Sequence, residues 1–311
     1  MEVNIMNEFL TGSKEVNKYV SDTQKEINKL GLLIPPYSDL YENMRVAERF
    51  SDEVVSHVIA LSIDMDKAYK PPIYLAIQGE PGEGKTTQAI AACTQRGFYV
   101  IYVSASELSG SHENDAKDKL QHIYNYAKRL REKNIVAIVI DDFHQGIINN
   151  DDNIKKTINT NILTGFMMNI AEQNGEYQIP IILTANSLSN IYEPLLRIGR
   201  ADIFYWEPNI EEKREIVKSI LGKYVKTSRM NDFEHFYYKY RHNNIAFFSQ
   251  IENQYRKNII KKMVKECSYF NSDKLNSISQ KVCQYKGKIT YSEIDKIASD
   301  ILKDRGIKNN V

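Results

Sequence analysis

The chain has 311 residues, enough for one large domain or two of ordinary size. Its composition, 42% apolar and 26% charged, is that of a soluble globular protein, and no apolar run is long enough to cross a bilayer. The mixed, partly acidic residues 1–10 exclude a secretory signal. Cys93, Cys267 and Cys283 lack metal-ligand spacing, and such a sparse, odd set indicates a reducing compartment. We therefore expect a cytoplasmic protein that does not enter a membrane.

The net charge of +1 is unevenly distributed along the chain. Residues 255–311 hold 13 Lys and Arg against 6 Asp and Glu, a balance of +7, so the remaining residues carry −6. A basic C-terminal segment can meet nucleic acid or an acidic partner. A solvated helical surface is the commoner explanation of such a charge run, and both interpretations stay open.

The chain begins with a polar, mostly helical lead over residues 1–50, broken by Pro35 and Pro36. Beyond it, short apolar runs alternate with longer helical patterns as far as Trp206. The runs cover residues 73–77, 98–103, 135–140, 181–184 and 203–206. They are too continuous for half-exposed antiparallel strands and suit the buried strands of a parallel sheet. The alternation predicts an α/β fold with a doubly wound, parallel, five-stranded sheet.

Two amphipathic patterns between the runs predict helices. One has Leu120, Ile123, Tyr124, Ala127 and Leu130 on one face, and the other has Ile158, Ile162, Phe166 and Ile170. After residue 206 the strand signals thin out, and helical patterns follow to the end. We therefore predict three parts: an N-terminal helical lead over 1–50, an α/β domain over 51–207, and a smaller α-helical domain with a basic C-terminal extension over 208–311.

One segment matches the phosphate-binding pattern G-x-x-x-x-G-K-[ST] between a predicted strand and a predicted helix. It reads Gly79-Glu80-Pro81-Gly82-Glu83-Gly84-Lys85-Thr86, and Thr87 follows it. The glycines let backbone N–H groups converge on phosphate oxygens, and the helix adds the positive end of its dipole. We expect Lys85 to bridge the β- and γ-phosphates of ATP, and Thr86 to bind Mg²⁺. Residues 79–87 are thus the predicted nucleotide site.

An acidic pair, Asp141 and Asp142, ends the apolar run 135–140. The carboxyl ends of parallel strands face the crevice where such sheets bind ligands. An ATPase needs one carboxylate there for the Mg²⁺ shell and another to polarise the attacking water. We assign Asp141 to the metal and Asp142 to the water, although the two roles could be exchanged. His144 follows closely, and we interpret it as a loop residue.

Two further features follow in chain order. Asn186 is the last residue of the segment 180–186, which contains the buried run 181–184. At the end of this strand its amide can orient the water or contact the γ-phosphate. The segment 193–200 then ends in Arg197 and Arg200, whose guanidinium groups can stabilise the charge on a transferring phosphoryl group in a neighbouring subunit. Alone, such a pair of arginines would be interpreted as ordinary surface residues. The functional interpretation is supported by their position in the chain after the other three motifs.

This order of motifs resembles the AAA+ ATPases, and within them the Rubisco activase family. The resembling stretches are residues 103–108, 168–171, 180–186, 191–200, 204–206 and 244–248, within a match from about 51 to about 255. The resemblance implies a ring, usually a hexamer, that holds ATP between subunits and pulls on a client protein through its central pore. By position it makes Lys85 and Thr86 the phosphate and metal ligands, Asp141 and Asp142 the acidic pair, Asn186 the first sensor, and Arg197 and Arg200 the fingers in trans.

The sequence departs from that family at two places. Where the family usually has an arginine in the helical lid, this chain has Glu252 or Gln254, depending on the register. Residues 109–115 are polar and lack the aromatic grip of many threading motors. Neither residues 1–50 nor the basic C-terminal helices carry the resemblance, so client choice could reside there.

Three functions are compatible with these features. The first is a ring-forming remodelling ATPase that acts on a protein partner, which the resemblance favours. The second is a nucleic-acid-associated ATPase, such as a helicase loader or a replication, transposition or defence factor, which the basic C-terminus favours. The third is a nucleotide-dependent structural assembly with slow turnover, which Glu252 or Gln254 would suit.

Overall fold

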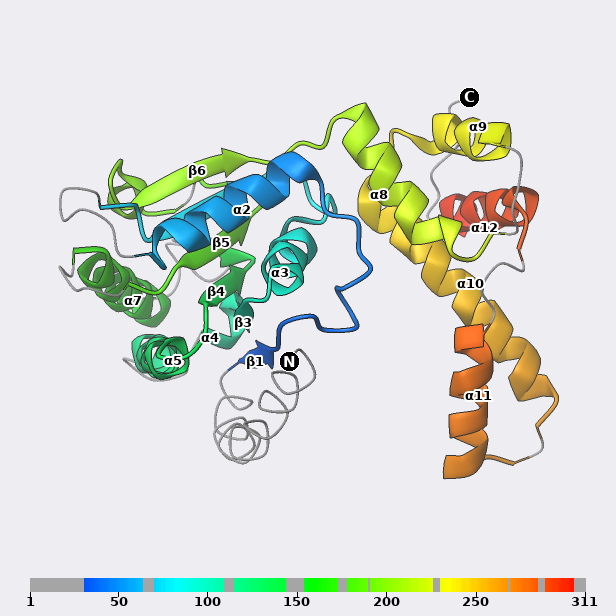
Figure 1. Ribbon diagram of the computed structural model, residues 1–311, viewed down its shortest axis with the longest axis horizontal. Helices are drawn as coiled ribbons and strands as arrows, with labels where there is room; N and C mark the ends of the chain where they lie inside the picture. Colours follow the sequence, from blue (N-terminus) through cyan, green and yellow to red (C-terminus); the bar gives the residue numbers. More distant parts are fainter. Residues whose placement is uncertain are drawn as a thin grey trace, which may run out of the picture. The chain divides into compact units, whose positions relative to one another are not determined.

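The computed structural model describes residues 31–63, 70–108, 115–143, 154–172, 178–189, 191–225, 230–267, 269–284 and 289–304 (Figure 1). At 154–160, 230–231 and 283–284 it describes the backbone alone. The chain forms two compact units, an α/β unit that runs to Trp206 and a helical unit that runs from Glu207. Two short segments, Met44–Ala47 and Glu80–Gly84, group with the helical unit. No described helix combines the length and apolarity that a membrane span requires.

The α/β unit is built on a six-stranded sheet in the order β1-β3-β4-β5-β2-β6. The strands are β1 (Leu32–Ile34), β2 (Tyr74–Gln78), β3 (Tyr99–Ser104), β4 (Val136–Asp141), β5 (Ile181–Ala185) and β6 (Ala201–Tyr205). Strands β2 to β6 are mutually parallel, which confirms the α/β class and the five predicted runs. Residues 136–140 are each at most 1% exposed, because both faces of β4 are covered.

The count of five strands is corrected by β1, which lies in the segment predicted to be a mostly helical lead. It pairs antiparallel with β3, with Leu33 opposite Ile101. Leu33 and Ile34 are 4% and 5% exposed, so burial on the sheet edge outweighs any helical preference of this short segment. Pro35 follows at once and cannot donate to a sheet ladder, which limits the strand to three residues. Residues 1–30 lie outside the described part.

Helices cover the sheet of the α/β unit. They are α2 (Glu48–Ala60), α3 (Lys85–Gln95), α4 (Ala105–Leu108), α5 (Asp115–Arg131), α7 (Ile154–Glu172) and the 3₁₀ helix η1 (Glu193–Leu196). Helix α5 buries the predicted face, with Leu130 at its half-buried end. Among the described side chains of α7, those of Leu163, Thr164, Met167 and Ile170 are buried, whereas Ile162 and Phe166 are half-buried, so the buried face is rotated from the predicted one. The side chain of Ile158 lies outside the described part.

The helical unit contains α8 (Ile210–Gly222), α9 (Met230–Tyr240), α10 (Ile245–Lys265), α11 (Ser272–Gln284) and α12 (Tyr291–Asp304). Its core is rich in aromatic side chains, among them Phe236, Tyr240, Phe247 and Phe248. The rings of Phe247 and Phe248 meet edge to face with centroids 5.3 Å apart. Asn244 caps α10 by accepting a hydrogen bond from the amide of Phe247.

Candidate functional site

The predicted phosphate loop connects β2 to α3, and α3 begins at Lys85. The Lys85 side chain is largely buried, and its ammonium group donates to the Gly79 carbonyl at 2.7 Å and to Asn186 Oδ1 at 3.0 Å. A Cβ on Gly79 would lie 2.1 Å from the Trp206 carbonyl oxygen, so only glycine fits there. The hydrogen bond between Lys85 and Asn186 brings together two predicted site residues that are 101 positions apart in the chain. They meet at the positive end of α3.

The Asp141 carboxylate lies at the carboxyl end of β4, at the centre of a cluster of hydroxyl groups from Thr86, Thr184 and Tyr102. Its Oδ1 accepts hydrogen bonds from the hydroxyls of Thr86 and Thr184, the latter at 2.8 Å. Its Oδ2 accepts from the Tyr102 hydroxyl at 3.1 Å. Carboxylate and hydroxyl oxygens are the hard donors that Mg²⁺ prefers, so Thr86 and Asp141 fit the predicted metal site.

Asp142, the second member of the acidic pair, has a different environment. Its φ of 52° is in the left-handed region, where Asp is better tolerated than most residues. Its backbone amide donates to Thr184 Oγ1 at 3.3 Å, which fixes the turn at the end of β4. The Thr86 hydroxyl donates to the Asp141 carboxylate, which supports the assignment of the metal role to Asp141.

Two residues of this cluster were missed by sequence reasoning. Thr184 is 1% exposed within the apolar strand β5, and a lone hydroxyl in such a run was a usable signal. Tyr102 lies on β3 and reaches Asp141 across the sheet, and no local pattern marks it. Burial first, and then the Asp141 charge, raise the pKa of Tyr102 to about 12. The phenol therefore stays protonated at neutral pH and can donate its hydrogen bond to Asp141.

The structure distinguishes the two predicted arginine fingers. Arg200 is engaged within its own chain, where its guanidinium donates to the Pro194 carbonyl and to the Glu172 carboxylate. Arg197 is exposed, and its guanidinium has no hydrogen bond or ion pair to any residue of the described ranges. Ile198 beside it is fully exposed. Arg197 is thus available to another molecule, whereas Arg200 braces the turn that carries it.

Residues 80–84 of the phosphate loop make their contacts inside the helical unit. The Asn244 side-chain amide donates to the Pro81 carbonyl at 3.1 Å, and the Ala246 amide donates to the Gly82 carbonyl at 2.9 Å. Gly82 has φ of 79°, and a Cβ there would lie 2.4 Å from the Asn244 amide nitrogen. Of the other predicted loop residues, Glu80 and Pro81 are exposed and Glu83 is buried. Gly84 has φ of 77°. Thr87, on α3, is exposed.

The two candidate positions for a lid arginine both lie on α10, and their side chains make hydrogen bonds within the helical unit. Glu252 accepts a hydrogen bond from the Tyr224 hydroxyl at 2.7 Å and pairs with Lys223 at 3.1 Å and Arg256 at 2.8 Å. Gln254, the other candidate, donates to Asn258 at 3.0 Å. Neither side chain supplies a cation there. His144 and residues 109–114 lie outside the described part of the chain.

Comparison with known proteins agrees with this geometry. Residues 75–209 match the family described as "ATPase family associated with various cellular activities (AAA)". The α/β fold, the phosphate loop and this match together identify an AAA+ ATPase domain. More particularly, about 70% of the chain resembles proteins named as Rubisco activases, as the motif order had predicted.

The relatives carry the name ribulose bisphosphate carboxylase/oxygenase activase. The protein from an Anabaena strain is 30% identical over 241 residues, which cover 73% of this chain and 57% of that protein. The protein from a Nostoc strain is 30% identical over 224 residues, covering 67% and 53%. Activase 2 from Nicotiana tabacum is 30% identical over 188 residues, covering 56% and 43%. The matched part of the chain spans about half the length of these relatives.

Proposed function

We propose that this chain binds ATP with Mg²⁺ and hydrolyses the γ-phosphate. The observation that carries the proposal is the convergence of Lys85, Asn186, Thr86 and Asp141 at the start of α3 and the carboxyl ends of β4 and β5. Lys85 and the amide groups at the start of α3 would bind the phosphates, and Thr86 and Asp141 would hold the metal. The bound Mg²⁺ neutralises phosphate charge.

The remaining residues would act on the attacking water. Asp142 would polarise it by accepting its proton, and Asn186, held by Lys85, would orient it toward the phosphate. Thr184 and Tyr102 would act through Asp141, because both hydroxyls donate to its carboxylate and fix its position. Removing any one of these hydrogen bonds would loosen the geometry that phosphoryl transfer requires.

Asp142→Asn is expected to keep ATP binding and to reduce turnover by about 10²-fold or more, the usual contribution of a general base. The measurements are phosphate release and titration with a fluorescent ATP analogue, with Asp118→Asn on the exposed side of α5 as a matched control. If Asp141→Asn shows this behaviour and Asp142→Asn does not, the two roles are exchanged. Unchanged turnover in both variants would contradict the acidic-site assignment.

We further propose that the chain works as a homo-oligomeric ring, hexameric by analogy, which remodels a protein partner. The support is the resemblance to proteins named as activases of an enzyme and the exposed Arg197, which suits a site completed by a neighbouring subunit. If Glu252 or Gln254 in place of a lid arginine weakens turnover, the same assembly would serve a structural role. The turnover number of the wild type in the phosphate-release assay separates the two cases.

A second candidate function, association with nucleic acid, is favoured by a groove on α10 that has four lysines among its lining residues. The groove has a volume of about 440 Å³ and is lined by Lys257, Ile260, Lys261, Lys262, Val264 and Lys265. Tyr269 and Phe270, after the end of α10, are 62% and 49% exposed. Exposed lysines can bind the phosphates of a single strand, and exposed aromatic rings can stack on its bases.

If this second function holds, a fluorescent single-stranded oligonucleotide should bind with an affinity that falls steeply as salt rises. Replacing Lys261 and Lys265 by Glu should lower the logarithmic salt slope by about 1.4 or more, at ~0.7 for each phosphate that the lysines no longer neutralise. Lys303→Glu, an exposed change on α12, is the control and should leave the slope unchanged. Absence of binding at low salt would exclude the nucleic-acid function.

A further inference from the structure

The phosphate loop contains an acidic residue, Glu83, at a position that must approach a highly charged anion. Glu83 is 8% exposed, and its Oε1 accepts a hydrogen bond from the ammonium group of Lys213 at 2.7 Å. The two side chains are 11% and 13% exposed, so solvent screens this pair poorly. A carboxylate so placed would repel a triphosphate if it were not neutralised, and the Lys213 ammonium group pairs with it.

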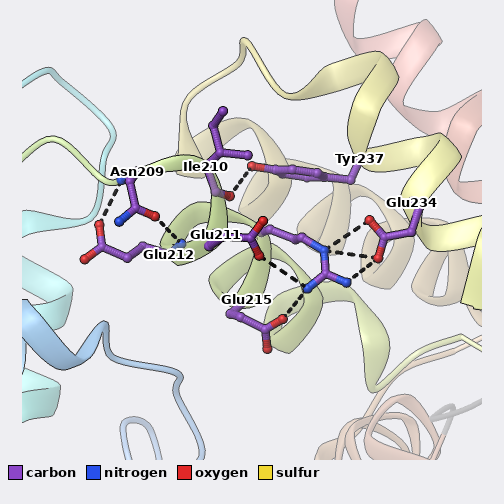
Figure 2. Close-up of polar contacts among 8 residues, drawn as sticks. Asn209, Ile210, Glu211, Glu212, Glu215, Glu234 and Tyr237 are labelled. Carbon is purple, nitrogen blue, oxygen red and sulfur yellow. Dashed lines mark hydrogen bonds and ion pairs between the residues drawn. The ribbon is translucent and has the colours of Figure 1, made fainter.

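The fold holds Lys213 in place through the start of α8. Asn209 caps the helix in a reciprocal box with Glu212, whose amide donates to Asn209 Oδ1 at 2.9 Å while its carboxylate accepts from the Asn209 amide at 2.8 Å (Figure 2). The Tyr237 hydroxyl donates to the Ile210 carbonyl at 3.0 Å (Figure 2). Both contacts fix the first turn of α8, in which Lys213 lies.

The next residue, Arg214, ties this turn to α9. Its Nε lies 3.1 Å from both Glu234 carboxylate oxygens, and its other nitrogens reach Glu234 and Glu215 (Figure 2). These hydrogen bonds lower the pKa of Glu234 and raise that of Arg214. Because both neighbours of Lys213 are anchored, the backbone at Lys213 is fixed. Its side chain therefore extends to Glu83 from a rigid helix end.

From this geometry we infer that Lys213 is a positioning residue for nucleotide binding. By neutralising and holding Glu83, it makes the phosphate loop receptive to the polyphosphate of ATP and links the shape of the loop to the start of α8. The inference rests on the proposed function, because it concerns the same nucleotide site. If Lys213 has this role, the dependence of ligand affinity on Lys213 should increase with the negative charge of the ligand.

The test is the affinity of Lys213→Met for ATP, ADP and adenosine, measured by calorimetry at low salt. Removing one partner of a poorly solvated charge pair leaves the other uncompensated, so ATP affinity should fall about tenfold or more. ADP should lose less, and adenosine should bind as it does to the wild type. In a Glu83→Gln background, which removes the carboxylate, the same Lys213→Met change should cost ATP less than about twofold.

Two controls keep the outcomes distinct. Lys213→Arg retains the charge and should retain most ATP affinity, and Lys218→Met, an exposed change on α8, should have no effect. Thermal melting without nucleotide reports whether each variant is folded. Failure of the wild type to bind ATP would overturn the proposed function itself. A folded Lys213→Met that loses ATP and adenosine equally, or that is not rescued by Glu83→Gln, would overturn the role of Lys213 alone.

Discussion

Lys85→Ala should abolish ATP binding and, with it, turnover. The Lys85 ammonium group is buried at the start of α3 and has oxygen acceptors at Gly79 and Asn186, so it is held where phosphate oxygens would meet the helix N-terminus. Hydrogen bonds to charged groups contribute about 1.5–3 kcal/mol each. Loss of two of them to phosphate corresponds to about 10²–10⁴ in affinity. Calorimetry with ATP, together with a phosphate-release assay, measures both effects.

The control for this variant is Lys133→Ala, which removes an exposed lysine from the same unit. Thermal melting must show that Lys85→Ala is folded, because the substitution also removes the hydrogen bonds to Gly79 and Asn186. A folded Lys85→Ala protein with unchanged affinity and turnover would contradict the proposed nucleotide site.

Arg197→Ala should leave ATP binding intact and lower turnover by about 10³-fold, the lower end of what arginine fingers contribute in phosphoryl transfer. The reason is that Arg197 is exposed on its own chain, whereas Arg200 is engaged by Glu172 and Pro194. Arg200→Ala should also lower turnover, because it loosens the turn that carries Arg197. Glu172→Ala removes one partner of Arg200 and should therefore reproduce part of this effect. If Arg200 is itself a finger, Glu172→Ala will behave nearly as the wild type.

Mixing two inactive subunits tests whether sites are shared. A Lys85→Ala subunit keeps its arginine but has a dead site, and an Arg197→Ala subunit keeps its site but lacks the arginine. In mixed assemblies the first can complete the second, so part of the activity should return. No recovery, with mixed assembly shown by native mass spectrometry, would count against completion in trans. Full turnover by a monomer at all concentrations would exclude the ring.

Local sequence patterns sufficed for the parts of the site that are contiguous in the chain. The phosphate loop is readable because a strand, a turn and a helix follow one another within a few residues, and the Asp141–Asp142 pair is readable because it directly follows a continuous apolar run. Thr184 and Tyr102 were not identified, since strand register brings them to Asp141 from elsewhere in the sequence. The partner of Glu83 lies 130 positions away, and no local pattern announces such a contact.

The same distinction applies to the fold. The central strands are continuous apolar runs because helices cover both faces of the sheet, and this burial is visible in the sequence. Strand β1 has three residues and belongs to the sheet only through its pairing with β3. Its tertiary context decides its conformation, and a propensity-based prediction has no access to that context.

Strand β1 also has a consequence for how the molecule behaves in concentrated solution. It occupies the outer hydrogen-bonding edge of β3, which carries the apolar residues Val100, Ile101 and Val103. Unpaired backbone groups along an apolar strand are a template for edge-to-edge association with other chains. A shortened chain that began after Ile34 would present that edge to solvent, and it would be prone to aggregate even though every residue of the proposed nucleotide site remained in place.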